Sequence, residues 1–474
     1  MIKILIKLNN KFILMKSKKI RFIENKYDAY NIDINNYKNK VLEEISLKEK
    51  LFDSKYPPTT NKRIDSLGKQ KYDISFYTGT GGNIYLYWRQ YLFYKKSPIF
   101  LKKFNDALQT NLNILKNNKK NNYTNSFFMG DSGIYLFCCI YGIETKKNKF
   151  FIEYFNKLID LKNLGKKIEL DLELLYGIAG YLYSLLFLKK YLISKKNEIS
   201  FNKEEKKLDE NIKDLFFELI EKGIKYQIYY EWNKCLLYPF PLDEESPQLY
   251  LGAAHGLIGV VYLLLCTIRL YPNLLNYEDK NTAPIIKKNY GDLKNLFLIN
   301  LNYIKSLQIE NTGNFPDDIE GKDSGEKVHF CHGCIGAVHL YLLAEELFPS
   351  NDFKNVAIKC HKCLWERGLL LKGNGICHGM SGITFALMKL YQFTKEELYI
   401  KEALAVAYAT FDPNIQKLVS KYEDRQRKAI GKPDTPYSLM EGDGGLLIMY
   451  YDLISLINGD NDCMTKVFPG YEIY

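Results

Sequence analysis

Hydrophobic residues recur along much of the chain with the period of a helix face. In the stretch "ITFALMKLYQF", apolar side chains fall at i, i+4, i+7 and i+8, namely at Ile383, Leu387, Leu390 and Tyr391. Comparable runs are "YLYSLLFLKKYL", "VVYLLLCTIRLY" and "AVHLYLLAEELF". Alternating strand patterns are scarce, so the pattern predicts an all-α fold.

Each of these runs directly follows a Gly-x-x-Gly element, which is the second repeating feature of the chain. Seven copies occur, at residues 79–82, 130–133, 177–180, 256–259, 333–336, 379–382 and 442–445. Glycine permits positive φ and close approach of the backbone, so each copy predicts a turn that leads into a helix. Between copies lie further amphipathic segments such as "NVAIKCHKCLWERGLLL" and "KEALAVAYATF". The repeat unit is therefore a pair of helices.

Seven helix pairs, with every glycine loop at the same end of one helix set, predict a closed double ring. This fold is an α/α toroid of seven inner and seven outer helices, in which closure lets the terminal repeats bury their faces against each other. An open solenoid is the alternative, because the spacing between copies is uneven. Residues 1–70 precede the first copy and are expected to form a leader and capping helices, and residues 71–474 the toroid domain.

Composition narrows the class of protein without changing the predicted fold. Of 474 residues, 46% are hydrophobic, which is enough for a large core. The formal net charge is +11, but lysine is scattered among asparagine rather than gathered in a basic and aromatic stripe, so no nucleic-acid partner is expected.

No apolar run reaches the roughly 20 residues of a membrane span. We expect a cytoplasmic protein, and peripheral contact with the plasma membrane through the basic N-terminus is left open.

Chemically active residues are concentrated at the glycine loops. The chain has six histidines, and three of them stand directly before the first glycine of a copy. In a closed ring the loops converge, so the residues in this position lie together; they are Thr78, Met129, Tyr176, His255, His332, His378 and Glu441. This concentration predicts a functional site at the loop end of the ring.

Two of the loops add a cysteine before the histidine, as Cys331-His332 and Cys377-His378. Thiolate and imidazole are ligands of zinc, which in catalytic sites takes three protein ligands and leaves one position open for substrate. Cys331, Cys377 and one adjacent histidine would form such a set. Cysteines in a cytosolic chain are expected to be thiols and metal ligands rather than disulfides.

A second cysteine pattern gives an alternative metal site. Cys331 and Cys334, together with Cys360 and Cys363, resemble a four-cysteine zinc site, which would be closed and structural. The interval between the two pairs exceeds the usual range for such sites. In addition, Cys360 and Cys363 lie in an amphipathic segment that the ring needs for packing, so the Cys₂His set is favoured.

Taken in order, the motifs resemble those of the LanC-like family, the eukaryotic relatives of bacterial lanthionine cyclases. The motifs are "YTGTGG", "GDSG", "LLYGIAGYLYSLLF", "GAAHGLIGVVYLL", "VHFCHGCIG", "KGNGICHGMSG" and "PDTPYSLMEGDGG". The resemblance implies the α/α toroid and one zinc ion held by Cys331, Cys377 and His378, with His332 in a supporting role. It also implies an enzyme that adds the thiol of glutathione to dehydroalanine or dehydrobutyrine, which form in proteins and peptides when phosphorylated side chains lose phosphate.

The resemblance further indicates residues that would act beside the metal. His255 is the expected general acid, because imidazole titrates near neutral pH; the alternative is a hydrogen-bonded structural histidine. Glu173 stands at an acidic position of the family and either assists catalysis or caps its loop. Lys327 takes the place of an arginine of the bacterial cyclases and would stabilise negative charge, without the guanidinium fork.

Recognition of glutathione is expected from two lysines. Lys372, just before "GNGICHG", matches a family position that contacts the carboxylates of the tripeptide. The family's arginine before "PDTP" is replaced by Gly431, and Lys432 follows it. This replacement leaves a non-catalytic, zinc-containing glutathione-binding adaptor as the alternative function. A bacterial-style peptide cyclase is disfavoured, because no leader-binding or dehydratase partner is recognisable in the chain.

Overall fold

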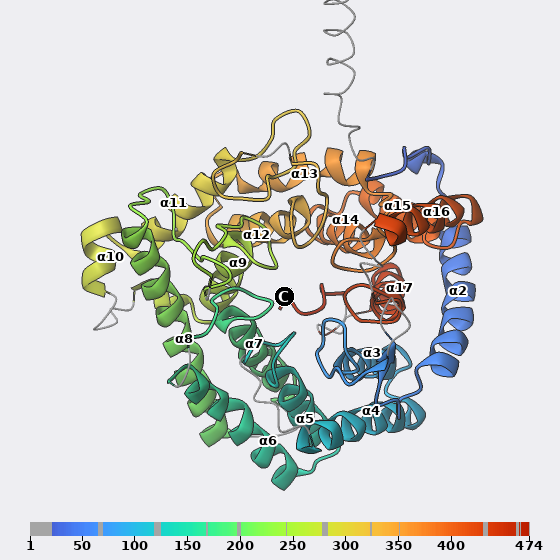
Figure 1. Ribbon diagram of the computed structural model, residues 1–474, viewed down its shortest axis with the longest axis horizontal. Helices are drawn as coiled ribbons and strands as arrows, with labels where there is room; N and C mark the ends of the chain where they lie inside the picture. The colour runs from blue at the N-terminus through green and yellow to red at the C-terminus, as the bar shows by residue number, and fades with distance from the viewer. Residues whose placement is uncertain are drawn as a thin grey trace, which may run out of the picture.

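The computed structural model describes residues 21–64, 70–117, 125–166, 169–196, 201–242, 244–276, 283–322, 325–349, 351–429, 435–460, 464 and 466–473. Within these ranges, seven inner helices form a ring (Figure 1). They are α3 (Gly81–Phe93), α5 (Ser132–Glu144), α7 (Ile178–Ser194), α9 (Leu257–Leu270), α12 (Cys334–Leu347), α14 (Met380–Thr394) and α17 (Asp443–Ile457). Each contacts the next in this order, and α17 returns to contact α3. The ring is therefore closed, and the open solenoid is excluded.

A second ring of seven helices surrounds the first in the described part of the chain (Figure 1). Its members are α2 (Ile34–Lys55), α4 (Pro98–Asn117), α6 (Asn148–Asp160), α8 (Asn202–Tyr229), α11 (Leu293–Ser306), α13 (Phe353–Arg367) and α15 (Glu397–Ala409). Each packs chiefly on one inner helix, which confirms the predicted double ring of seven inner and seven outer helices.

The remaining described elements are short or lie outside the double ring. Helix α10 (Ala283–Tyr290) packs on α11, and α16 (Pro413–Ala429) follows α15 in the chain. Strand β1 (Arg63–Ile64) pairs antiparallel with β2 (Gln70–Lys71). The 3₁₀ turns are η1 (Ala29–Asn31), η2 (Leu161–Lys166) and η3 (Pro272–Asn276).

The two rings differ in how their helices distribute apolar residues. Outer helix α6 buries a single face, formed by Phe151, Tyr154, Phe155, Leu158 and Ile159 at helical spacing. Inner helix α7, in contrast, is buried on all sides without interruption from Ile178 to Leu192. An all-round apolar helix requires neighbours on every side, and the closed double ring provides them. No helix in the described ranges combines the length and the apolarity needed to span a membrane.

The N-terminal helix α2 occupies the seventh outer position. It packs against α17, the last inner helix, and against α15, the preceding outer helix. The seventh helix pair is therefore formed by the last inner helix, α17, and by α2, which precedes all the inner helices in the chain. The sequence pattern alone assigned this helix to capping helices before the first repeat. The division of the chain into residues 1–70 and a toroid domain of residues 71–474 stays a prediction.

Backbone contacts join the seven glycine loops around the ring. Six junctions are hydrogen bonds: Phe330 N–H to Cys377 C=O (2.7 Å), Cys377 N–H to Met440 C=O (2.8 Å), Met440 N–H to Tyr77 C=O (3.1 Å), Phe76 N–H to Phe128 C=O (2.7 Å), Phe127 N–H to Gly180 C=O (3.2 Å) and Leu175 N–H to Ala254 C=O (3.3 Å). At the seventh junction, a Cβ on Gly252 would lie 1.9 Å from the Cys331 carbonyl oxygen, so only glycine permits the approach. We call this continuous set of loops the loop belt.

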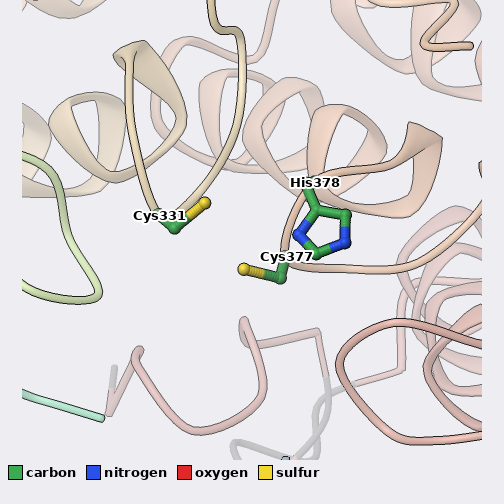
Figure 2. Close-up of side chains that lie close together, drawn as sticks. All are labelled: Cys331, Cys377 and His378. Atoms are coloured by element: carbon green, nitrogen blue, oxygen red, sulfur yellow. The ribbon is translucent and has the colours of Figure 1, made fainter. Parts of the chain in front are cut away.

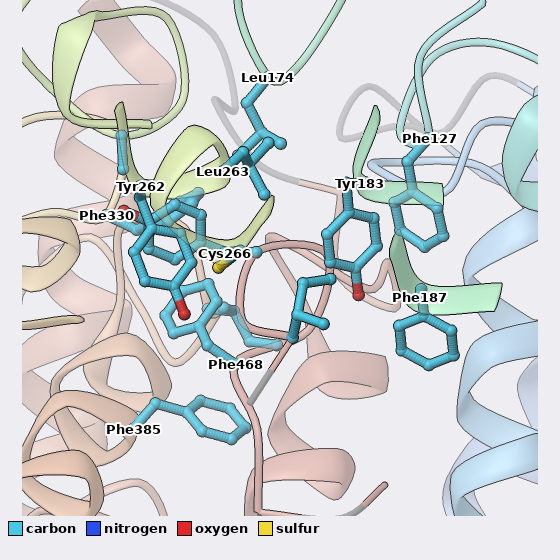
Figure 3. Packing of buried hydrophobic residues seen from close by; sticks show 14 of the residues in the cluster. Phe127, Leu174, Tyr183, Phe187, Tyr262, Leu263, Cys266, Phe330, Phe385 and Phe468 are labelled. Carbon is cyan, nitrogen blue, oxygen red and sulfur yellow. The ribbon is translucent and has the colours of Figure 1, made fainter. Parts of the chain in front are cut away.

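The centre of the ring is filled by the end of the chain. Residues 466–473, which we call the C-terminal segment, run into the middle of the inner ring, where the C-terminus lies in Figure 1. Phe468 and Tyr471 are fully buried there, and Figure 3 shows Phe468 among aromatic side chains of the inner helices and the loop belt. The ring is thus a packed core rather than a pore.

A buried ion pair lies at the junction that closes the inner ring. The Arg89 guanidinium on α3 pairs with the Asp452 carboxylate on α17, and both side chains are at most 1% exposed. Arg89 also donates a hydrogen bond to the Met464 carbonyl oxygen at 2.5 Å. Burial raises the pKa of Asp452 to about 6, although the Arg89 charge opposes this shift.

We expect Arg89→Leu to lower the free energy of unfolding by about 3–5 kcal/mol, because it leaves the Asp452 carboxyl buried without its partner. The double variant Arg89→Leu/Asp452→Leu should lose less, since no charge stays buried. Denaturant unfolding followed by circular dichroism measures both. Lys157→Ala is the control: it removes an i,i+4 pair with Glu153 on the surface of α6 and should change stability by about 0.5 kcal/mol or less. A loss in Arg89→Leu no larger than in the control would contradict the prediction.

Candidate functional site

Three potential metal ligands meet in the fifth and sixth loops of the belt. The Sγ atoms of Cys331 and Cys377 and a ring nitrogen of His378 all lie within 4.8 Å of one another. Figure 2 shows the three side chains converging from two neighbouring loops. Within the described ranges, this is the one group of three or more His, Cys, Asp and Glu side chains with ligand atoms so close together.

The donor set fits zinc. Two thiolates and one imidazole are typical zinc ligands, at about 2.0–2.3 Å from the ion. Donor atoms within 4.8 Å of one another can reach such distances with small side-chain movements. Cys377 and His378 are buried whereas Cys331 is partly exposed, so the cluster is accessible from the side of Cys331. Such a site would have three protein ligands, one of which is partly exposed.

A carboxylate lies behind His378. Glu441, from the seventh loop, places Oε1 3.9 Å from His378 Nε2. Its other oxygen accepts a hydrogen bond from the Thr435 N–H at 3.0 Å, which holds the carboxylate in place. A carboxylate beside a ligand histidine orients the ring and fixes its protonation in metal sites.

Asn314 braces the loop that carries Cys331. Its side chain is fully buried, and its Oδ1 accepts a hydrogen bond from the Cys334 N–H at 2.9 Å, at the start of α12. Its Nδ2 donates to the carbonyl oxygens of Gly325 (2.7 Å) and Lys327 (2.9 Å). Gly333 turns the loop with φ of +112°, a conformation that favours glycine. The position of Cys331 is therefore fixed from both sides of its loop.

The two thiols differ in acidity. The pKa of Cys331 is lowered, first by the hydrogen bond from Cys377 and, against burial, by the charges of Lys372 and Lys327. The pKa of Cys377 is raised, because its thiol donates that hydrogen bond and is buried. Cys331 is therefore the more acidic of the two thiols.

His255 and Glu173 form a second cluster beside the thiols. The Glu173 carboxylate is fully buried, accepts hydrogen bonds from the N–H groups of Leu175 (2.7 Å) and Tyr176 (2.5 Å), and lies 3.2 Å from His255 Nδ1. Burial opposes the charged imidazole, but Glu173 outweighs it, so the pKa of His255 is raised above its ordinary value. Phe240 stacks on the imidazole with ring centroids 4.7 Å apart. His255 is thus held in one orientation, with Nδ1 paired to Glu173.

His332 links this cluster to the thiol loop. Its ring centroid lies 6.5 Å from that of His255 and 5.2 Å from that of Tyr250. Burial and the charges of Lys327 and His255 lower the pKa of His332 to about 3, so the ring is neutral near pH 7. Lys327 forms an ion pair with Asp317, which holds its ammonium near the loop.

Of the two lysines expected to bind glutathione, one lies at the site. Lys372 is partly buried, and its charge contributes to the lowered pKa of Cys331, so its ammonium lies near that thiol. Lys432 and Gly431 lie outside the described residues. The role predicted for Lys432 stays a prediction.

The thiols of the alternative four-cysteine site are divided between two places. Cys334 is hydrogen-bonded to Cys360 and Cys363 in the buried interface of α12 and α13. Cys331 is hydrogen-bonded to Cys377 instead. The geometry therefore favours the Cys₂His set over four cysteines.

Sequence reasoning missed Tyr77, whose hydroxyl is hydrogen-bonded to the Cys377 sulfur. Burial, followed by the nearby thiols and Glu441, raises the pKa of Tyr77 well above its ordinary value, so the hydroxyl stays protonated and donates. The repeat contained a signal that could have found it: Tyr77 stands two residues before Gly79, as Cys331 and Cys377 stand two before Gly333 and Gly379.

A closed double ring of helices with a thiol and imidazole cluster on its glycine loops defines a helical-toroid protein. The family model described as "Lanthionine synthetase C-like protein" matches residues 70–473, so the chain belongs to the lanthionine synthetase C-like family, as its motifs indicated.

Two relatives and one solved structure are informative. The chain is 28% identical over 391 residues to "Glutathione S-transferase LANCL1" of Danio rerio, covering 81% of this chain and 82% of that protein. It is 27% identical over 357 residues to "LanC-like protein GCL1" of Arabidopsis thaliana, covering 73% and 70%. The structure of "Nisin cyclase" covers 90% of this chain and 95% of its own, with a TM-score of 0.54 at 15% identity. This last likeness shows that the two proteins share the toroid fold.

We expect Glu173→Gln to lower the pKa of His255 below the ordinary value of 6.5, because the favourable charge is removed while burial remains. An NMR titration of the imidazole resonances measures the shift. Asp171→Asn is the matched control, because Asp171 is a weaker contributor to the same pKa and should move it less. Equal shifts in the two variants would show that Glu173 does not control the charge of His255.

Proposed function

We propose that this protein catalyses the zinc-dependent addition of the glutathione thiol to dehydroalanine or dehydrobutyrine residues in proteins or peptides. The observation that carries the proposal is the convergence of Cys331, Cys377 and His378 beside the His255–Glu173 pair. Membership of the family and the name of the zebrafish relative support a glutathione transferase. The expected location is cytoplasmic, and any contact with the plasma membrane stays a prediction.

In this proposal Cys331, Cys377 and His378 would hold one zinc ion, and glutathione would supply the thiol that the ion activates. Zinc in such a site lowers the pKa of a bound thiol, which keeps the sulfur as a thiolate near neutral pH. Tyr77 donates to the Cys377 sulfur and Glu441 lies behind His378, so both ligand side chains are oriented by neighbours. Lys372, whose charge lowers the pKa of Cys331, would bind a carboxylate of the tripeptide.

The addition needs a proton donor. Attack of the thiolate on the β-carbon forms a carbon–sulfur bond and an enolate, whose α-carbon must then receive a proton. His255 pairs Nδ1 with Glu173, so Nε2 is the nitrogen that would deliver that proton. Its raised pKa keeps a larger share of the imidazole protonated near pH 7 than an ordinary histidine would have. Lys327, held by Asp317, adds positive charge near the developing enolate.

A non-catalytic, zinc-containing glutathione-binding adaptor is the second candidate. The observation in its favour is Gly431, which stands where the family carries an arginine. The adaptor would bind zinc and glutathione but would not accelerate the addition. Turnover with a dehydroalanine peptide therefore separates the two functions.

The first test is metal content and turnover of Cys377→Ala. We expect the wild-type protein to bind one zinc ion and to add glutathione to a dehydroalanine peptide faster than buffer does. Cys377→Ala should lose both properties, because only two ligands remain. Cys334→Ala is the matched control: it removes the thiol three residues from Cys331 but belongs to the separate α12–α13 cluster, so zinc should stay bound. Metal analysis and mass spectrometry of the peptide provide the readouts, and full zinc occupancy in Cys377→Ala would refute the ligand assignment.

The second test is the pH profile of His255→Asn. The wild-type rate should decline as the pH rises through the raised pKa of His255, because the proton donor is lost. His255→Asn should reduce the rate by about 10²–10⁴-fold and remove this decline, while zinc stays bound. An unchanged profile in the variant would leave His255 with only a structural role.

A further inference from the structure

The C-terminal segment, residues 466–473, contacts the loop that carries Cys331 from inside the ring. Phe330, the residue directly before Cys331, stacks on Phe468 with ring centroids 4.5 Å apart and meets Tyr471 edge-on at 4.9 Å. Figure 3 shows Phe330 and Phe468 together in the packed centre of the ring. Phe330 is 1% exposed and lies within this core.

The same segment also touches the far end of that loop. The Tyr471 hydroxyl donates a hydrogen bond to the Gly336 carbonyl oxygen at 3.2 Å, in the first turn of α12. Along the chain, Cys331 therefore lies between two residues, Phe330 and Gly336, that contact the C-terminal segment. Since the Phe330 N–H also bonds the Cys377 carbonyl oxygen, a shift of Phe330 would move Cys331 relative to Cys377.

The segment is itself firmly anchored. Glu472 is 2% exposed, accepts a hydrogen bond from the Phe468 N–H at 3.1 Å, pairs with Lys389 of α14 and lies 3.6 Å from His339 Nε2 of α12. Burial disfavours its charge, but Lys389 and His339 outweigh this and lower the pKa of Glu472. Lys190 of α7 donates to the Ile473 carbonyl oxygen. The segment thus bridges helices from both sides of the ring.

We propose that the C-terminal segment is a positioning element for the metal loop: by packing Phe468 and Tyr471 against Phe330 and Gly336, it holds Cys331 at the distance from Cys377 and His378 that metal binding needs. The inference rests on the proposed zinc site. The segment contacts the metal loop at Phe330 and Gly336, so its action passes through Phe330 and the backbone of the loop. Residues that orient metal ligands in this way typically change metal affinity by about 10–100-fold when they are removed.

The test is the zinc affinity of Phe468→Ala, measured by competition with a chromophoric chelator. We expect affinity to fall by about 10–100-fold, and the thiolate-to-metal absorption of the cobalt(II)-substituted protein to shift. Tyr471→Phe, which removes only the hydroxyl on Gly336, should weaken binding less. Phe151→Ala is the control: it empties an equally buried site between α5 and α6, far along the chain from the metal loop, and should leave zinc affinity unchanged.

The outcomes separate this inference from the proposed function. Tight zinc binding by the wild-type protein, with equal affinity in Phe468→Ala and Phe151→Ala, would overturn the positioning role and leave the zinc site intact. Absence of zinc binding by the wild-type protein would overturn both. Should Phe468→Ala fail to fold, Phe468→Leu and Tyr471→Phe decide the matter, because wild-type affinity in both would also overturn the inference.

Discussion

The backbone contacts that join the seven glycine loops are the constraint on which the site depends. Cys331 and Cys377 belong to different repeats, yet the Phe330 N–H binds the Cys377 carbonyl oxygen at 2.7 Å, and their sulfur atoms lie together. A buried N–H without a partner would be costly, and at six of the seven junctions a backbone N–H of one loop bonds a carbonyl oxygen of its neighbour. Because the inner ring is closed, with α17 against α3, no loop can leave this arrangement without breaking two junctions.

The belt also determines the electrostatics of the site. Every inner helix begins directly after a glycine loop, so the N-termini of these helices all face the belt and favour negative charge there. Lys372 and Lys327 act in the same direction by lowering the pKa of Cys331. Glu173, in contrast, raises the pKa of His255. The fold thereby lowers the pKa of a thiol and raises the pKa of an imidazole within one set of neighbouring loops.

The register of the repeat predicted much of the candidate site. His255, His332 and His378 share the position before the first glycine, and the structure brings all three loops together. For Glu173 the sequence left two roles open, loop cap or assistance to catalysis. Its carboxylate accepts hydrogen bonds from the N–H groups of Leu175 and Tyr176 in its own loop and also pairs with His255. Asn314 could not be found this way, because it lies outside every glycine motif and acts through a loop that only the fold brings near.

The sequence by itself determined the helices, their apolar faces and the glycine turns, because helical periodicity and the close backbone approach that glycine permits are encoded by short stretches of residues. It also determined that the repeats could close, since the inner helices are apolar on all sides. The tertiary structure decided what closure brings together: α2 beside α17, the C-terminal segment in the centre of the ring, and Tyr77 on the Cys377 sulfur. These contacts join residues far apart in the chain, and their partners depend on the packing of the whole ring rather than on any local pattern.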